Sequence, residues 1–434
     1  MKKKTQIVVV GGGAGGLPLV RRLGAYFGRE LYDIILVDRS RSHIWKPLLH
    51  EVAAGSLDAN MDEIGYGGHG VRWGYRFFYG SLESINRENQ QIITAPFIDE
   101  DGREIVARHT IRYDYLVLAY GGVSNDFGIP GVRDHCLFLE NRDQAEAFRQ
   151  KLLNQCFRVS HLAGTDGDAR VRICIIGGGA TGVELAAELY NAAKGLRDYG
   201  LEVFDESRLE VTLLEAGPRI LPALPEDLAQ AAHEELEALG VRVQVGTMVT
   251  GIDGTGVAIK DGDRIEADLR VWAAGVKGAT IAGSLDGLEL TRSNQIQVRS
   301  TLQTTVDDRI FAIGDCCSCP QPDGPPVPPR AQSANQMAAT VFENIRSLIA
   351  GMTPKPFVYR DKGSLVSLSR FSTVGSLMGN LVGGRMAIEG RLARLAYMSL
   401  YRLHLIAVHG WLKGLGLIAV GHINQVIRPK LKLH

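Results

Sequence analysis

Two glycine-rich loops are the residues best suited to chemistry in this 434-residue sequence. Each loop has the pattern G-x-G-x-x-G, follows a short β-rich run and precedes a helix-forming stretch. The glycines of the first loop are Gly11, Gly13 and Gly16, and those of the second are Gly177, Gly179 and Gly182. In such a loop the glycines permit a tight turn, close approach of backbone to a pyrophosphate, and packing of helix on strand. The helix N-terminus offers free N–H groups to the anion. The spacing therefore predicts two dinucleotide sites.

Each loop is followed by a second strand that ends in an acidic residue. That residue is Asp38 after the first loop and Glu215, at a longer spacing, after the second. A carboxylate at this place accepts hydrogen bonds from an adenosine ribose, although an acid there can also be a solvated strand end. Glu215 should repel a 2′-phosphate, which favours NADH over NADPH, whereas Arg219 nearby would weaken that preference. We interpret residues 195–208 as a polar insertion that lengthens the second spacing.

The repeat extends beyond the two loops. Each copy has a later strand that closes on glycine, Tyr115–Gly121 in the first and Leu269–Gly275 in the second. A third such strand, farther downstream, ends in Gly314-Asp315. The sequence therefore predicts an N-terminal nucleotide-binding unit that is interrupted by the second unit and completed after it.

Composition excludes several classes of protein. Lys and Arg number 48 and Asp and Glu number 48, so there is no basic excess of the kind that nucleic-acid binding requires. The first apolar run after the basic start is only four residues long, too short for a secretory signal. The six cysteines are too few for a disulfide framework. Cys316 and Cys319 have Cys-x-x-Cys spacing, but without a second pair they are expected to be structural thiols, and no metal is predicted.

The C-terminal segment departs from this balance, because Arg391–His434 contains seven basic and no acidic residues. Apolar residues in Arg391–Ile406 follow the i, i+3, i+4 spacing of an amphipathic helix. The uncharged stretches Leu403–Leu412 and Gly414–Ile427 are too short to span a bilayer. We expect this segment to lie on an anionic membrane surface. The alternative is a dimer or core helix that is basic by accident.

Three further blocks of sequence resemble those of type II NADH dehydrogenases, the NADH:quinone oxidoreductases among the flavin-dependent pyridine-nucleotide oxidoreductases. They are Lys46–Gly55, Thr181–Ala186 and Ala331–Gln336, and the last is similar to the family's A-Q-x-A-x-Q quinone-site motif. The resemblance runs from about Thr5 to the C-terminus. Tyr120 departs from the family, because a small residue or threonine is usual there.

Two smaller departures accompany these blocks. Trp45 replaces a more usual phenylalanine, and Cys317 and Cys319 are additional to the family's cysteine after Gly-Asp.

The resemblance implies a role for each predicted site residue. Those implied to bind FAD are Gly11, Gly13, Gly16, Asp38, Ala119, Gly121 and Asp315. Those implied to bind NADH are Gly177, Gly179, Gly182, Glu215 and Gly275. Gln332 and Gln336 are implied to face the quinone, and Glu184 to move protons near the nicotinamide and the flavin. Taken alone, Glu184 can also be a first-turn helix acid favoured by the helix dipole, and the two glutamines can be helix surface.

The sequence therefore predicts an α/β fold with two Rossmann-type dinucleotide-binding domains and a C-terminal membrane-associating region. The predicted FAD domain is discontinuous (1–125 and 295–350), the NADH domain is 150–290, and the anchoring or dimerisation region is 355–434. The expected function is NADH:quinone oxidoreduction without proton pumping. The expected partners are a membrane quinone, the bilayer surface and a second copy in a homodimer, at the cytoplasmic face of the cell inner membrane.

Three other functions compete with this interpretation. A disulfide reductase needs a Cys-x4-Cys pair soon after Asp38, but residues 39–55 contain no cysteine. A sulfide:quinone oxidoreductase needs a cysteine pair near the flavin and no NADH site, and Cys156 has no evident partner. A non-catalytic NADH sensor or membrane scaffold remains open, and flavin reduction followed by quinone reoxidation would separate it from an enzyme.

Overall fold

The computed structural model describes residues 4–57, 63–162, 169–196, 206–260, 262–281, 283–322, 324–368, 373–379, 384–389, 402 and 405–427. The chain divides into two units. The first comprises residues 1–44, 63–123 and 276–360, and the second comprises residues 45–62, 124–275 and 361–434. Each unit is therefore built from segments that are distant in the sequence.

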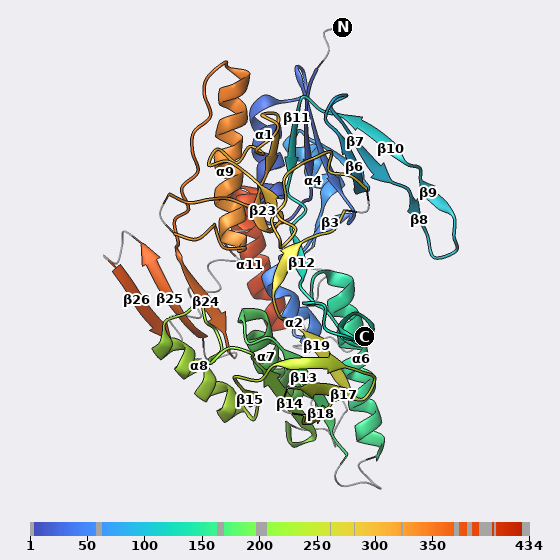
Figure 1. Ribbon diagram of the computed structural model, residues 1–434, viewed down its shortest axis with the longest axis vertical. Helices are drawn as coiled ribbons and strands as arrows, with labels where there is room; N and C mark the ends of the chain where they lie inside the picture. The colour runs from blue at the N-terminus through green and yellow to red at the C-terminus, as the bar shows by residue number, and fades with distance from the viewer. Residues whose placement is uncertain are drawn as a thin grey trace. The chain divides into compact units, whose positions relative to one another are not determined.

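The first unit is organised around a five-stranded parallel sheet in the order β22-β11-β1-β2-β5, of which β11 is labelled in Figure 1. Its strands are β1 (Thr5–Val10), β2 (Tyr32–Asp38), β5 (Arg76–Tyr79), β11 (Tyr115–Leu118) and β22 (Ile310–Ala312). The central strands are short aliphatic runs whose side chains are buried on both faces, as parallel sheets require. In the register, Ile7 of β1 pairs with Tyr115 and with Ile34.

Helices α1 (Gly16–Phe27), α4 (Tyr66–Trp73) and α9 (Ala331–Ile349) belong to the same unit. On α9 the buried side chains recur at helical spacing, so that one face is apolar: Ala334, Met337, Ala338, Val341 and Ile345. Helix α1 starts directly at the third glycine of the first loop and contacts both β2 and α9. The loop is thus held between the end of β1 and the start of α1.

The remaining elements of the first unit are small. An antiparallel sheet has the order β10-β7-β6. Its strands are β6 (Ser81–Asn86), β7 (Gln91–Ala95) and β10 (His109–Arg112). The short elements are β3 (Ser42–His43), β4 (Ile64–Gly65), β8 (Phe97–Ile98), β9 (Glu104–Val106), β12 (Gly122–Ser124), β20 (Val276–Gly278), β21 (Ile296–Gln297), β23 (Cys317–Ser318) and the 3-10 turn η4 (Gly314–Cys316).

The second unit repeats the parallel arrangement, with a four-stranded sheet in the order β15-β14-β13-β19. Its strands are β13 (Val171–Ile176), β14 (Leu209–Leu214), β15 (Arg242–Gln244) and β19 (Leu269–Trp272). Ile173 of β13 pairs with Val211 on one side and Leu269 on the other, as Ile7 does in the first unit. The α/β class with parallel sheets, predicted from the sequence repeat, is confirmed.

Helices and a second class of sheet complete this unit. The helices and 3-10 turns are η1 (Lys46–Leu48), α2 (Leu49–Ala54), α5 (Val132–His135), α6 (Arg142–Leu162), α7 (Ala180–Leu196), η3 (Glu206–Arg208), α8 (Glu226–Leu239) and α11 (Trp411–Ile427). The antiparallel strands are β16 (Val249–Ile252), β17 (Gly256–Ile259), β18 (Arg264–Glu266), β24 (Gly363–Ser367), β25 (Thr373–Gly379) and β26 (Gly384–Glu389). Helix α2 contacts α6 and α7.

Most of the predicted amphipathic helix Arg391–Ile406 lies outside the described residues. Helix α11 follows it, and its apolar side chains Trp411, Leu415 and Val420 are exposed. Within the part of the chain that the structure describes, no helix is long and apolar enough to cross a membrane.

Candidate functional site

The first glycine loop forms a backbone cradle that excludes side chains. Gly11 has a φ of +101°, and a side chain there would overlap the Ala119 carbonyl. A side chain on Gly16 would overlap the carbonyl oxygen of Gly11. Gly13 differs, because no atom lies within 4 Å of the position its Cβ would take. The loop is therefore tight where strand meets helix and open where backbone would approach a ligand.

The carboxylate of Asp38, at the end of β2, holds this loop. Its Oδ2 accepts a hydrogen bond from the Gly12 backbone at 2.6 Å, and its Oδ1 accepts one from the Ser40 backbone at 2.7 Å. The buried Tyr66 hydroxyl donates to the Gly12 carbonyl at 2.9 Å. Burial and the neighbouring Asp38 charge raise the pKa of Tyr66 well above its usual value. Sequence reasoning missed Tyr66, which lies far from Gly12 in the chain and carries no motif.

Two further turns meet at the carboxyl ends of the adjacent strands β11 and β22. Gly121 has a φ of +77° and Gly314 has a φ of +75°, conformations that favour glycine. The two turns lie close together: a Cβ atom built on Gly122 would lie 3.2 Å from the Cβ atom of Asp315. Ala119 is tied to β1 because its N–H donates to the Val10 carbonyl at 2.7 Å. The predicted residues after β11 and β22 thus lie at the sheet edge where α/β folds bind ligands.

The second loop has the same construction. Gly177 has a φ of +118°, a side chain on Gly182 would overlap the Gly177 carbonyl, and the Cβ position of Gly179 is open. Glu215, at the end of β14, accepts hydrogen bonds from two backbone N–H groups, those of Gly178 and Gly217, both at 2.7 Å. The predicted acid therefore holds each cradle through the same contact.

Gly275 closes β19 with a φ of +67°, beside the ring of Phe127. Arg219, the residue that would weaken discrimination against a 2′-phosphate, donates to the carbonyls of Leu221, Pro222 and Leu224. Because backbone carbonyls bind its guanidinium, Arg219 is not directed at Glu215, and the carboxylate of Glu215 remains the charge at the strand end.

Glu184 lies near the start of α7, the helix that the second loop begins, and is only 7% exposed. Its Oε1 accepts a hydrogen bond from the Ser367 backbone at 3.2 Å. Its Oε2 lies 3.5 Å from Nδ1 of His50, which is 4% exposed. Burial raises the pKa of Glu184 to about 8 and lowers the pKa of His50 to about 4. At neutral pH, therefore, both side chains are uncharged.

Gln332 and Gln336 lie in the first turns of α9, in the first unit, whereas Glu184 belongs to the second. The Gln336 amide donates to the Arg360 carbonyl at 2.8 Å and accepts from the Arg360 N–H at 3.1 Å. This pairing fixes the chain at residue 360 against α9. The sequence placed the two glutamines on one helical face but gave no sign of the Arg360 contact.

The six cysteines are all buried and none forms a disulfide. Burial raises the pKa of Cys316 to about 12, and its thiol donates to backbone carbonyls of Leu118 and Ile313. Within the described ranges, no three His, Cys, Asp or Glu side chains are arranged to hold a metal ion.

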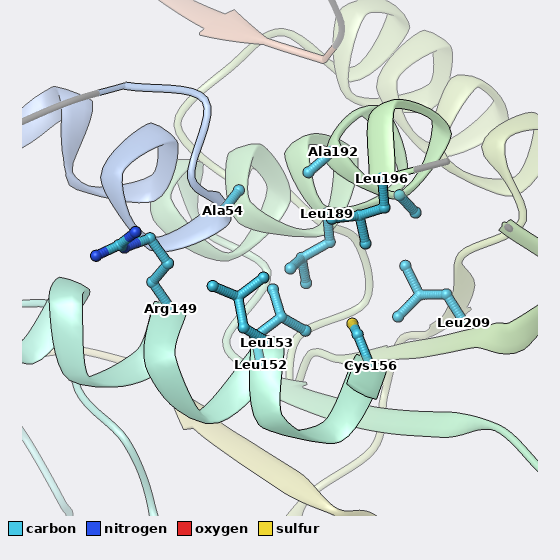
Figure 2. A pocket seen from close by; sticks show the side chains of 10 residues that line it. Ala54, Arg149, Leu152, Leu153, Cys156, Leu189, Ala192, Leu196 and Leu209 are labelled. Carbon is cyan, nitrogen blue, oxygen red and sulfur yellow. The ribbon is translucent and has the colours of Figure 1, made fainter. Parts of the chain in front are cut away.

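A small cavity in the second unit contains none of the predicted site residues. Its lining is apolar except for one guanidinium and comprises Ala54, Arg149, Leu152, Leu153, Cys156, Leu189, Ala192, Ala193, Leu196 and Leu209. Figure 2 shows the leucines of α6 facing those of α7 across it. Arg149 forms an ion pair with Glu146 at 2.5 Å. The cavity is a gap in the packing of these helices.

Comparison with known proteins agrees with this geometry. Residues 5–338 match the family model described as pyridine nucleotide-disulphide oxidoreductase. A Haemophilus influenzae protein named Type II NADH:quinone oxidoreductase is 46% identical over 441 residues, covering 99% of each chain. A Mycobacterium tuberculosis protein of the same type is 29% identical, covering 93% of this chain and 85% of the relative.

The solved structure of NDH2 from Plasmodium falciparum in complex with NADH superposes with a TM-score of 0.82 at 19% identity, covering 99% of this chain and 100% of that one. At that identity the superposition shows the fold, and the full-length 46% match shows the family. The chain belongs to the pyridine nucleotide-disulphide oxidoreductases and, among them, to the type II NADH:quinone oxidoreductases.

Proposed function

We propose that this protein oxidises NADH and reduces a membrane quinone, with FAD bound by the first unit and NADH by the second. The observation that carries the proposal is the duplicated cradle: in each unit an acid at a strand end accepts from the backbone N–H that follows the first glycine of the loop, Asp38 from Gly12 and Glu215 from Gly178. The full-length relative from Haemophilus influenzae is named for the same activity.

The residues of the first unit fit FAD. The open backbone at Gly13 offers the pyrophosphate its approach, and the Asp38 carboxylate at the strand end is an acceptor suited to a ribose hydroxyl. The Tyr120 hydroxyl is buried and makes no hydrogen bond within the described residues, so it can donate to a bound group. Bound FAD would supply the two-electron chemistry, as acceptor of a hydride from NADH and donor of electrons to quinone.

Three side chains would serve the quinone. Gln332 would donate or accept at the quinone headgroup, while Gln336 would fix the Arg360 backbone beside it. Glu184, protonated at neutral pH because burial raises its pKa to about 8, would supply a proton to the reduced quinone. Reduction of a quinone to a quinol takes up two protons, so a buried acid near its own pKa suits this task.

The C-terminal segment would attach the protein peripherally to the cytoplasmic face of the inner membrane. Trp411, Leu415 and Val420 of α11 expose apolar surface, and the segment from Arg391 onwards is basic. Apolar burial and attraction to anionic lipid act together in such segments. A homodimer through the same surface is the alternative.

The test of the proposal separates the two half-reactions in the FAD-loaded protein. Stopped-flow absorbance should show rapid bleaching of the flavin by NADH, followed by its reoxidation by quinone. We expect Gln332→Leu and Gln336→Leu to slow reoxidation and leave bleaching nearly unchanged, because a hydrogen bond lost to the quinone does not affect the half-reaction with NADH. Asn335→Leu, between them on α9, is the matched control. Bleaching without quinone reoxidation in the wild type would favour an NADH sensor instead.

A further inference from the structure

A buried histidine from a distant part of the sequence faces the proposed proton donor. His50 lies on the short helix α2 and Glu184 on α7, and the two helices contact each other within the second unit. Nδ1 of His50 lies 3.5 Å from Oε2 of Glu184. Both side chains are less than a tenth exposed. Nothing in the function proposed above uses this histidine.

The other groups around the pair come from four elements, η1, α2, α7 and β24. Glu51 of α2 lies 3.9 Å from Nε2 of His50 and is about a quarter exposed, at 28%. Glu188, one helical turn after Glu184, adds a second negative charge. The Ser367 N–H of β24 donates to Oε1 of Glu184, and a His50 ring nitrogen hydrogen-bonds to the Pro47 carbonyl. Both neighbouring carboxylates therefore oppose ionisation of Glu184, and the Ser367 N–H favours it.

A neutral imidazole suits both protonation states of a carboxyl group, because one ring nitrogen donates and the other accepts. It can accept from the protonated acid or, in the other tautomer, move its single N–H from the Pro47 carbonyl to the carboxylate. Since Oε1 of Glu184 already accepts from Ser367, Oε2 is the oxygen free to carry the proton, and it is the oxygen that faces His50. An apolar side chain at position 50 would serve neither state.

We propose that His50 is a positioning residue for Glu184, which holds Oε2 in place and stabilises the carboxylate formed when Glu184 gives its proton to the quinone. This inference rests on the proposed function of Glu184. In the step, the Oε2–H bond breaks and its proton goes to one quinone oxygen, while the hydride of NADH supplies the two electrons and the hydrogen that becomes the second proton. The carboxylate is then held by the Ser367 N–H and by the single ring N–H of His50, which leaves the Pro47 carbonyl, until solvent returns a proton.

Replacing His50 removes a donor from the ionised form of Glu184 in a dry site. Hydrogen bonds to a charged acceptor are about twice as strong as neutral ones, so the carboxylate loses more than the acid does. His50→Phe should therefore move the titration of Glu184 upward by about one to two pH units. His50→Gln, whose amide also donates and accepts, should stay within about half a unit of the wild type.

The experiment titrates the FAD-loaded protein by infrared difference spectroscopy, following the carbonyl band of a protonated carboxylic acid. Glu184→Gln identifies the band by abolishing it. His50→Phe should shift the pH at which the band disappears and should slow quinone reoxidation about tenfold, leaving flavin reduction by NADH unchanged. His50→Met is the second apolar variant, for use where the phenylalanine ring disrupts packing. His233→Gln, which removes a surface His–Glu contact on α8, is the matched control.

The outcomes distinguish this inference from the function on which it rests. If Glu184→Gln removes the band and slows reoxidation but both apolar variants titrate like the wild type, the role of His50 is refuted. If Glu184→Gln leaves reoxidation unchanged, the proton-donor role of Glu184 fails first. A double variant, His50→Phe with Glu184→Gln, should be no slower than Glu184→Gln alone, since His50 acts through Glu184. Additive slowing would contradict the inference.

Discussion

Replacing the buried carboxyl of Glu184 by an amide should change how the stability of the protein depends on pH. The fold raises the pKa of this group from 4.5 to about 8. The folded state therefore binds the proton more tightly than the unfolded state does, and the free energy of unfolding falls as pH rises from 4.5 to about 8. The stabilisation is complete below the unfolded pKa and is lost once pH passes the folded one.

The magnitude follows from the part of this interval that is tested. The interval from pH 6.5 to the folded pKa of about 8 is about 1.5 pH units wide. Over it, the free energy of unfolding falls by about 1.4 kcal/mol per unit. Glu184 should thus cost the wild type about 2 kcal/mol of stability between pH 6.5 and 9. His50 acts on the opposite side, because its pKa is lowered from 6.5 to about 4, and its contribution is lost as pH falls below 6.5. The interval above pH 6.5 therefore isolates Glu184.

The assay is urea unfolding of the FAD-loaded protein at half-unit steps of pH, for the wild type, Glu184→Gln and the control Glu234→Gln on the exposed face of α8. Glu184→Gln should show the flatter curve, with the wild type and this variant diverging by about 2 kcal/mol by pH 9. Parallel curves for the wild type and Glu184→Gln would refute the reasoning, because they would mean that the carboxyl is already ionised in the folded protein at neutral pH.

Three other perturbations test separate parts of the molecule. Tyr66→Phe, which removes the hydrogen bond to the Gly12 carbonyl, should weaken FAD binding about fivefold to tenfold in reconstitution titrations; unchanged affinity would make that bond irrelevant to the cradle. Glu215→Gln should narrow the preference for NADH over NADPH in steady-state assays, and a wild type that uses both equally would show that Glu215 is misassigned. Truncation before Arg391 should leave FAD bound but reduce flotation with anionic vesicles and activity with long-tailed quinones. Equal flotation of both proteins would place the anchor elsewhere.

The cradles were predictable because the determinants of each are local. A glycine that must adopt positive φ, a β-rich run before it and a helix after it are neighbours in the chain, so spacing alone places Gly11 and Gly177 correctly. The acids also follow, since the strand beside β1 or β13 must end at the same sheet edge. The structure adds that Asp38 and Glu215 hold the loops themselves through backbone N–H groups.

The contacts that the sequence did not reveal join segments that no periodicity links. Tyr66 contacts Gly12, and His50 contacts Glu184, each from a distant part of the chain. Neither pair has a sequence spacing that belongs to a motif. Long-range contacts depend on how the helices pack, and this packing cannot be read from a single sequence.

Gln336 shows how one residue of a predicted motif can have two physical roles. Its amide both donates to and accepts from the backbone of Arg360, which requires a primary amide of this length. A carboxylate at this position would face the Arg360 carbonyl without a hydrogen to give, and an apolar side chain would take away the partner of both backbone groups. Glutamine is therefore needed at position 336 to hold the backbone at residue 360, independently of any contact with the quinone.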